Sequence, residues 1–314
     1  MKIAALLAVP LSLFCLHVRA QQSLPLWPHG APEAAQTTDT EQSSYTTRPG
    51  FANKQFALVS NVTVPTLNLY PVPAGISPSG AAVVVFPGGG YQGLAVTLEG
   101  EQPCAWYNSL GIFCAWVKYR VPFATHYPQN FAQLEDAQQA VRLVRSHAAA
   151  WHLDPKRIGV MGFSAGGHLA VTLSQHYDDA RVLATAAAKE VDASLSARPD
   201  FVLLGYPAYL PVPAMNDDRQ PPTAALPLDP ALRPNKNTPP TFILQAANDA
   251  QYVDSSLSYA TALKNAGVPV ELLLYPDGGH GFGMRPPGVS PEEWTVPAAA
   301  WLRWLKVIPA AASH

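Results

Sequence analysis

The segment at residues 158–170 reads Ile-Gly-Val-Met-Gly-Phe-Ser-Ala-Gly-Gly-His-Leu-Ala. Its apolar start, Ile158–Met161, is typical of a buried strand, and apolar residues return at helical spacing from Leu169 onward. Between them stands Gly162-Phe-Ser-Ala-Gly166, in which the two glycines remove side chains that would collide with neighbouring backbone in a tight turn. The segment therefore predicts a strand, a sharp turn with Ser164 at its tip, and a helix.

This turn gives Ser164 a chemical role. Because a helix begins directly after the serine, unpaired N–H groups and the positive end of the helix dipole point at whatever the hydroxyl attacks. Gly-x-Ser-x-Gly in this context is the nucleophile elbow pattern, so Ser164 is the candidate nucleophile. The alternative is a glycine-rich turn that only closes a strand. His168 lies one helical turn further on and is interpreted as a packing or supporting residue.

The composition indicates a large globular chain with a lightly charged surface. Of its 314 residues, 48% are hydrophobic and 13% are charged, and the formal net charge is −2. The chain contains no basic run, which argues against nucleic acid or an anionic membrane surface as a partner. Its length allows one large α/β domain or two smaller ones.

Residues 1–20 have the features of a cleaved secretory signal. Lys2 supplies a positive start, Ile3–Leu16 supplies an apolar core, and Val18-Arg-Ala20 supplies a small-residue cleavage site. A membrane anchor is the alternative, but Pro10 and the short apolar span argue against it. We therefore expect a secreted or periplasmic protein that is not attached to a membrane once the signal is removed.

Removal of this segment leaves two cysteines, Cys104 and Cys114. In an oxidising compartment the two thiols could form a disulfide, but Cys114 lies in a strand-like run and could equally be a small buried hydrophobic residue. Their spacing does not fit a zinc site. The sequence leaves the pairing open.

Strand and helix patterns alternate along the chain after an extended or partly disordered arm at 21–54. Residues 55–64 and 66–72 alternate in polarity and predict an antiparallel pair at a sheet edge. Apolar runs predict strands buried on both faces at 81–86 and 112–119, and further strands at 201–206, 241–247 and 270–275. Helical spacing predicts helices at 101–110, 131–151, 253–266 and 291–307. We therefore expect one α/β domain at 55–314, with a mostly parallel central sheet and helices on both faces.

Two loops of this domain are candidates for the site. The strand at 81–86 runs into Pro87-Gly-Gly-Gly-Tyr91, whose bare backbone N–H groups can approach an oxygen atom closely, as an oxyanion hole requires. A flexible turn is the alternative, and the absence of a following Gly-Lys-Ser/Thr excludes a phosphate-binding P-loop. Residues 207–240 are rich in proline, and a loop of this length could cover the site.

A serine nucleophile needs a general base, and the base needs a carboxylate that orients it. His280 is the candidate base because Asp277-Gly-Gly-His-Gly-Phe282 follows the last predicted strand, where loops gather over a parallel sheet. Asp249 is the candidate acid because it follows the strand at 241–247. Asp254 is its rival, but an aspartate at the start of a helix is explained as an N-cap.

From about residue 55 to its end, the chain resembles the α/β-hydrolase esterases of the bacterial acetylxylan and feruloyl esterase group, which are related to the hormone-sensitive-lipase-like esterases. The matching motifs are Pro87–Tyr91, Lys118-Tyr-Arg120, Gly162–Ala170, Asn248-Asp249 and Gly278–Gly283. The resemblance implies that Gly89, Gly90 and Ala165 donate the N–H groups of an oxyanion hole. The commoner family loop begins His-Gly-Gly, and Pro87 stands in place of that histidine.

Together, the residues and the resemblance predict a secreted serine carboxylesterase that works through an acyl-enzyme on Ser164, with His280 and Asp249 as its partners. It needs no cofactor and no metal ion. The expected substrates are acyl esters, acetyl foremost, on plant polysaccharide or its oligosaccharides. A general small-ester or lipid esterase and a peptidase are alternative enzymes, and a non-catalytic hydrolase-fold binding protein is the alternative from another class.

Overall fold

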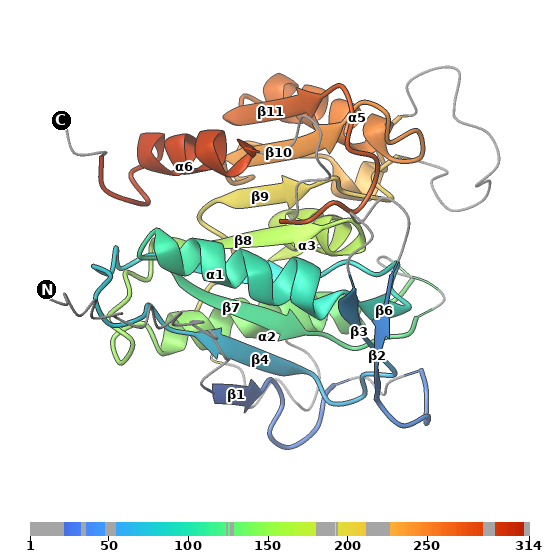
Figure 1. Cartoon of the computed structure of the whole chain (residues 1–314), viewed down its shortest axis with the longest axis vertical. Coiled ribbons are helices and arrows are strands. Elements are labelled where there is room, and N and C mark those ends of the chain that lie inside the picture. Colours follow the sequence, from blue (N-terminus) through green and yellow to red (C-terminus); the bar gives the residue numbers. More distant parts are fainter. Residues whose placement is uncertain are drawn as a thin grey trace, which may run out of the picture.

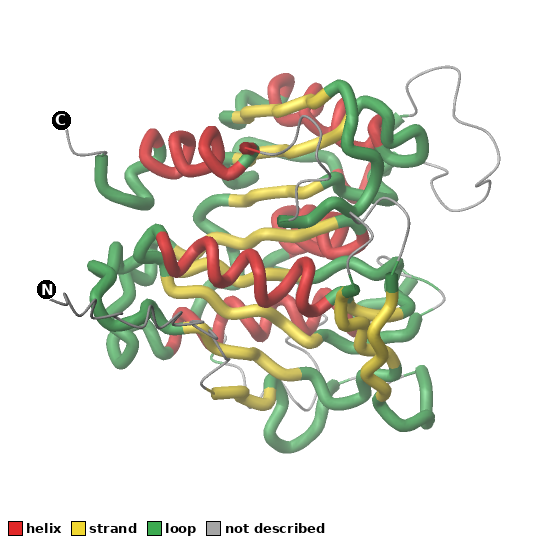
Figure 2. Tube along the Cα trace, viewed as in Figure 1, coloured by secondary structure: helices red, strands yellow, loops and turns green. Residues whose placement is uncertain are grey.

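The computed structural model of the chain describes residues 22–32, 36–47, 55–123, 125, 129–179, 192, 194–211, 227–284 and 293–310. Strands and helices alternate through most of these residues (Figure 2). The expected signal at 1–20 lies outside them, so its cleavage stays a prediction. Within the described ranges, the helices lack the combination of length and apolar character that a membrane span needs.

An eight-stranded sheet forms the centre of the molecule (Figure 1). The strand order is β1 (Gln22–Pro25), β4 (Thr66–Tyr70), β7 (Phe113–Lys118), β5 (Ala82–Phe86), β8 (Ile158–Phe163), β9 (Val202–Gly205), β10 (Thr241–Ala246) and β11 (Val270–Tyr275). Neighbouring strands from β7 to β11 are parallel, whereas β1 and β4 add antiparallel pairs at one edge. The expected mostly parallel sheet is confirmed.

Helices cover both faces of this sheet, as expected. They are α1 (Gln102–Ser109), α2 (Ala132–Ser146), α3 (Ala165–His176), α5 (Val253–Asn265) and α6 (Thr295–Trp304). On one face, Trp106 of α1 approaches Trp294, next to α6, with ring centroids 5.3 Å apart. On the other face, α3 packs on α2 and bonds α5 through Gln175 and Tyr259. In Figure 1, α1 crosses in front of the sheet and α2 and α3 lie behind it.

The predicted helix at 131–151 ends earlier than its apolar pattern. Helix α2 stops at Ser146, and residues 147–152 form turns. Ala148 is buried in these turns, and Trp151 stacks on Phe113 of β7. The buried residues of these turns are apolar, as are those of the helix before them, so the apolar pattern continues beyond the end of the helix.

The predicted pairing of the strands at 55–64 and 66–72 is wrong, although both strands exist. Strand β3 (Phe56–Ser60) belongs to a separate three-stranded sheet with β2 (Gln42–Thr46) and β6 (Gly93–Leu94), whereas β4 joins the central sheet. Between β3 and β4, Asn61 has a φ of 56°, in the left-handed region, and Val62 forms an isolated antiparallel bridge with Val121. Alternation identifies a half-buried strand but does not choose its partner.

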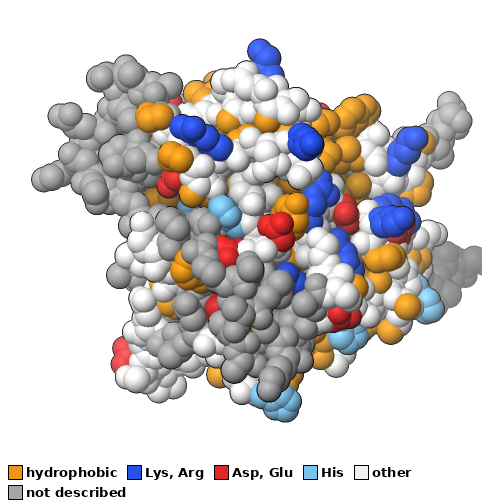
Figure 3. All heavy atoms as spheres, turned by 180° about the vertical axis from the view of Figure 1, so that it is seen from behind, with side chains coloured by type: hydrophobic (Ala, Val, Ile, Leu, Met, Phe, Trp, Pro, Cys, Tyr) orange, Lys and Arg blue, Asp and Glu red, His pale blue; other side chains and the backbone are white. Residues whose placement is uncertain are grey.

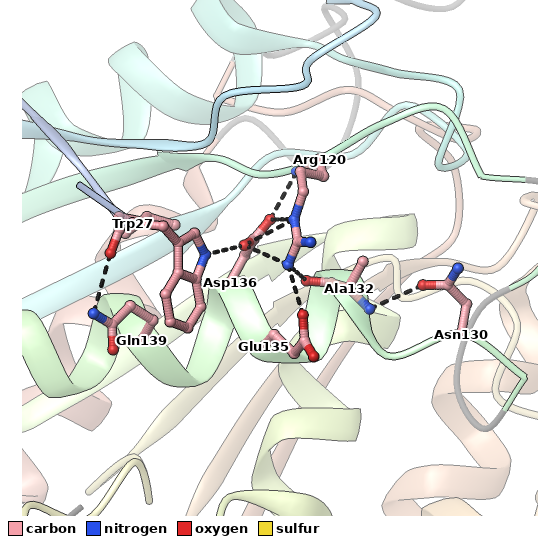
Figure 4. A network of polar contacts seen from close by, with 8 residues as sticks. Trp27, Arg120, Asn130, Ala132, Glu135, Asp136 and Gln139 are labelled. Atoms are coloured by element: carbon pink, nitrogen blue, oxygen red, sulfur yellow. Dashed lines mark hydrogen bonds and ion pairs between the residues drawn. The ribbon is translucent and has the colours of Figure 1, made fainter. Parts of the chain in front are cut away.

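The N-terminal arm is docked on the domain where the structure describes it. Strand β1 pairs with β4, and the two residues that follow it, Leu26 and Trp27, are buried. The indole N–H of Trp27 donates to Asp136, which also binds the buried guanidinium of Arg120 (Figure 4). Gln139 donates to the carbonyl oxygen of Leu26. These contacts attach the arm to helix α2.

The described elements share one main hydrophobic cluster, to which both helix layers contribute. Inside this cluster, Cys104 of α1 and Cys114 of β7 form a disulfide, which answers the question that the sequence left open. The single-domain organisation that we expected is therefore confirmed. On the face that Figure 3 shows, Lys and Arg side chains are interspersed with Asp, Glu and apolar side chains among the described residues.

Candidate active site

Ser164 stands at the predicted turn between β8 and α3. Its φ of 50° and ψ of −119° lie in a sparsely populated backbone region. A Cβ at Gly162 would come within 2.0 Å of the Gly166 oxygen, and a Cβ at Gly166 within 2.1 Å of the Phe86 oxygen. Only glycine fits at either position. The same close approach brings the start of α3 against the end of β5, where the glycine-rich loop begins.

The side chains of Ser164, His280 and Asp249 form one line of hydrogen bonds. The Ser164 Oγ lies 2.8 Å from His280 Nε2, and His280 Nδ1 lies 2.8 Å from Asp249 Oδ2. Each comes from a different loop after a parallel strand (β8, β11 and β10), and these strands all end at the same edge of the sheet. With its proton on Nδ1, the imidazole donates to Asp249 and accepts the serine hydroxyl at Nε2.

Two residues that the sequence analysis gave no role hold Asp249 and His280 in place. Asp249 is buried, and Gln245 donates to the same carboxylate oxygen that binds His280. The side chain of Asn248 accepts the backbone N–H of Gly279, which connects the aspartate turn to the histidine loop. Neither role could be predicted, because a polar residue near the end of a strand, such as Gln245, or in the turn after it, such as Asn248, does not indicate its partner.

Asp254, the rival carboxylate, lies at the start of helix α5, but not in the N-cap position that we expected. Helix α5 begins at Val253 with Tyr252 in the cap position and no side-chain cap bond, so Asp254 is inside the first turn. The N-cap interpretation of Asp254 is therefore wrong. An acidic side chain there still interacts favourably with the positive end of the helix dipole.

The glycine-rich loop lies directly against Ser164. A Cβ on Gly88 would come within 2.9 Å of the Ser164 Cβ. Gly89 has a φ of 137°, and a Cβ on it would come within 2.1 Å of the Gly93 oxygen. The loop adopts this path because the Gly89 carbonyl accepts the N–H of Gln92 and of Gly93. These positions need glycine for the close packing as well as for the backbone conformation.

The three N–H groups of the expected oxyanion hole remain available. Gly89 and Gly90 lie in this loop, and Ala165 is the first residue of α3. Within the described residues, no acceptor takes the backbone N–H of Gly89, Gly90 or Ala165. Backbone donors without partners beside a serine hydroxyl can bind a developing negative charge on oxygen.

A buried carboxylate that the sequence analysis missed supports this loop from behind. Glu99 is only 2% exposed; its Oε2 accepts the Gly88 N–H and its Oε1 accepts the Tyr206 hydroxyl, both at 2.7 Å. Burial raises the pKa of Glu99, and the bonds from Tyr206 and Gly88 and the nearby His280 oppose that rise. The one available signal was a charged residue at the end of the otherwise uncharged run at 92–98.

Two tyrosines hold the other side of the loop. The hydroxyl of Tyr91 lies 2.8 Å from His168 Nδ1, so the supporting role expected for His168 is exerted on this loop. The hydroxyl of Tyr119 donates to the Pro87 carbonyl at 2.6 Å. Proline in place of the commoner histidine therefore still gives the loop a hydrogen bond, through its carbonyl oxygen.

Two tyrosine rings pack against His280, the partly exposed Tyr252 and the buried Tyr206. The Tyr252 ring lies 4.7 Å from the imidazole and 5.5 Å from the ring of Tyr209. Residues 212–226 of the loop expected to cover the site lie outside the described residues, so that role stays a prediction. Among the residues that the structure describes, His, Cys, Asp and Glu side chains do not gather into a group of three or more that could hold a metal ion.

Comparison with known proteins identifies the fold family and several similar enzymes. A family profile described as alpha/beta hydrolase fold matches residues 83–284. The acetylxylan esterase of Xylanibacter ruminicola is 34% identical over 224 residues, which cover 66% of this chain and 42% of that protein. The endo-1,4-beta-xylanase B of Butyrivibrio fibrisolvens is 31% identical over 209 residues, or 64% of this chain and 32% of that protein. The chain thus spans less than half the length of both relatives.

A solved structure aligns over nearly the whole chain. It is the acetyl ester-xyloside bifunctional hydrolase from Caldicellulosiruptor lactoaceticus, with 31% identity and a TM-score of 0.68. The alignment covers 93% of this chain and 99% of that one. The family match at residues 83–284 spans the positions of Ser164, Asp249 and His280.

Proposed function

Because the chain belongs to the α/β-hydrolase fold family, we propose that it is a serine carboxylesterase with Ser164 as nucleophile, His280 as general base and Asp249 as the orienting carboxylate. The observation that carries this proposal is the line of two 2.8 Å hydrogen bonds from Ser164 through His280 to Asp249. Ala165, the residue after Ser164, and Gly89 and Gly90, in the loop that packs on Ser164, carry backbone N–H groups that have no acceptor among the described residues. A nucleophile, a base, an orienting acid and oxyanion donors together are what acyl transfer requires.

The proposed reaction has two halves. His280 takes the hydroxyl proton as the Ser164 oxygen attacks the ester carbonyl, and the N–H groups of Gly89, Gly90 and Ala165 stabilise the oxyanion. In a hydrolase, loss of one such donor raises the activation free energy by about 2.7–4 kcal/mol. The tetrahedral intermediate collapses, and His280 returns the proton to the departing alcohol. His280 then deprotonates a water molecule, which attacks the acyl-enzyme and releases the acid.

For the substrate, we propose acyl esters, acetyl foremost, on plant polysaccharide or its oligosaccharides. The names of the relatives support this: an acetylxylan esterase, an endo-1,4-beta-xylanase and an acetyl ester-xyloside hydrolase. The partly exposed ring of Tyr252 beside His280, and the ring of Tyr209 next to Tyr252, also support it, because apolar faces combined with hydroxyl groups suit a sugar ring.

We further propose that the protein is exported. The signal-like segment at 1–20 and the disulfide between Cys104 and Cys114 support this proposal, since disulfides persist mainly in oxidising compartments. Expression of the full chain followed by cell fractionation and mass measurement of the product tests it. Uncleaved protein that stays in the cytoplasm would contradict it.

Hydrolysis of p-nitrophenyl acetate by wild type and Ser164→Ala tests the proposed activity. We expect turnover in the wild type and near loss of it in the variant, whereas equal rates would favour a binding protein without chemistry. Acetate release from acetylated xylan, compared with ferulate release from feruloylated xylan and with hydrolysis of longer acyl esters, then tests the substrate. Faster hydrolysis of longer acyl esters than of acetylated xylan would favour a lipid esterase.

A further inference from the structure

Glu99 occupies a position that the triad and the oxyanion donors do not explain. Its buried carboxylate lies between the glycine-rich loop, through Gly88, and Tyr206, whose hydroxyl in turn accepts the backbone N–H of Gly283 at 2.8 Å. We propose that Glu99 is a positioning residue whose ionised carboxylate fixes the oxyanion loop relative to the loop that carries His280, an inference that rests on the proposed function.

On the oxyanion side, Glu99 controls the residue just before the first donor. Gly88 is bound on both sides, since its N–H donates to Glu99 and its carbonyl accepts the N–H of Ala95 at 2.9 Å. The peptide bond between Gly88 and Gly89 is planar and trans, so a fixed Gly88 carbonyl directs the Gly89 N–H the opposite way. Loss of the Glu99 bond would remove one of the two hydrogen bonds that hold the Gly88 residue, and so loosen the carbonyl that orients the Gly89 N–H.

On the histidine side, Glu99 acts through Tyr206. The Tyr206 ring packs edge to face on His280 and on Phe282, with centroids 5.1 and 4.8 Å away. Its hydroxyl both donates to Glu99 and accepts from Gly283, which closes the loop around the imidazole. The backbone N–H of Tyr206 donates to the Leu244 carbonyl of β10, so the ring projects from a fixed point.

Both bonds to Glu99 require it to be an acceptor on each oxygen, which is the state of an ionised carboxylate. The groups that act on this carboxylate are the hydroxyls of Tyr206 and Tyr119, the Gly88 N–H and His280. A proton on Oε2 would face the Gly88 N–H, which can only donate, and a proton on Oε1 would have to be donated to the Tyr206 oxygen, which reverses that bond. Because burial raises the pKa of Glu99, acidification reaches this state earlier than for an ordinary glutamate. On the acid side of its pH profile, activity should therefore fall with the binding of more than one proton, one of them on Glu99.

Steady-state kinetics of Glu99→Gln, measured from pH 4 to 9 with p-nitrophenyl acetate, test the proposal. We expect kcat to fall about 10- to 100-fold, with KM within about twofold, because loss of an anchor displaces donors more than it changes substrate binding. On the acid side of the Glu99→Gln profile, activity should fall with the binding of one proton fewer than in the wild type. Tyr206→Phe should lower kcat as well, and the double variant should lose less than the sum, because both act through one chain of bonds.

Two control variants remove similar groups away from the site. Asp200→Asn changes a carboxylate that also accepts a backbone N–H, from Ile158 at the opposite end of β8, and whose pKa burial also raises. Tyr259→Phe removes a buried hydroxyl that binds Gln175. We expect both to keep the wild-type kcat and pH profile in folded protein, as judged by near-ultraviolet circular dichroism.

The outcomes separate this proposal from the proposed function. If Ser164→Ala is inactive but Glu99→Gln keeps the wild-type kcat and acid-side profile, the positioning role is overturned and the esterase proposal stands. If Ser164→Ala is as active as wild type, the esterase proposal itself fails. Should Glu99→Gln not fold, Tyr206→Phe decides alone, and an unchanged kcat in that variant overturns the positioning role.

Discussion

The indole N–H of Trp27 donates to the carboxylate of Asp136 at 2.7 Å, across 109 positions of the chain. Asp136 is fully buried and also binds the equally buried guanidinium of Arg120, to which Glu135 adds a second carboxylate. Buried charges are stable only when their remaining hydrogen-bonding capacity is satisfied. The N-terminal arm therefore completes a polar network inside the domain (Figure 4).

Replacement of this indole should destabilise the fold. Trp27→Phe keeps an aromatic ring but removes one of the donors to Asp136 Oδ1 and leaves this buried oxygen with Arg120 alone, so we expect a loss of about 1–3 kcal/mol in the free energy of unfolding by urea. Trp304, which is 64% exposed, provides the control, and Trp304→Phe should stay within about 0.5 kcal/mol of wild type. Equal stability of the two variants would show that the arm is not part of the folded core.

The identity of the acid can be tested with the two aspartates that the sequence offered. Asp249→Asn presents an amide to His280 Nδ1 and favours the wrong imidazole tautomer, so we expect kcat to fall by about 10⁴-fold while the fold is kept. Asp254→Asn, in the first turn of α5, should leave kcat within about twofold, since the helix dipole effect is a matter of stability. Kinetics in which Asp254→Asn is the more damaged variant would contradict this assignment.

The close packing at the nucleophile turn predicts that a methyl group at Gly166 lowers activity through a steric clash and not through a loss of backbone freedom. Gly166→Ala would place a Cβ within 2.1 Å of the Phe86 oxygen and push α3 away from β5, so we expect kcat/KM to fall at least about 100-fold. Gly75 has a φ of +91° but nothing within 4 Å of its Cβ position. Gly75→Ala should cost about 1–2 kcal/mol of stability and leave kcat/KM unchanged. Similar kcat/KM losses in both variants would point to backbone strain alone.

The raised pKa of Glu99 predicts the direction in which its contribution to stability changes with pH. A carboxyl whose pKa is higher in the folded than in the unfolded chain contributes stability below the unfolded value, near 4.5, and that contribution is lost as pH rises through the folded value. Gln cannot ionise. The free energy of unfolding of wild type minus that of Glu99→Gln should therefore decrease from pH 4 to pH 8 in urea titrations. An increase over this range would mean that the folded pKa of Glu99 is depressed.

The sequence predicted the central strands from their apolar runs. It placed the buried strands β5, β7, β8 and β10, and also the partly exposed β11, within two residues of their bounds, and it indicated the turn at Ser164 from its two glycines. It did not find the partner of β3, since strand pairing is decided by non-local contacts, nor the end of α2, which packed turns conceal. The role of Glu99 was missed because it depends on Tyr206, 107 positions away, and that of Gln245 because a polar residue in a buried strand does not indicate its partner.

If the proposed mechanism holds, the hydroxyl of Ser164 is the group that becomes acylated. Labelling with a stoichiometric organophosphonate ester, followed by proteolysis and tandem mass spectrometry, identifies that group. We predict one adduct per chain, located on Ser164, whose formation matches the loss of esterase activity and which His280→Ala greatly slows. Complete inactivation with the adduct on another residue, or full activity in protein whose Ser164 is fully modified, would contradict the account.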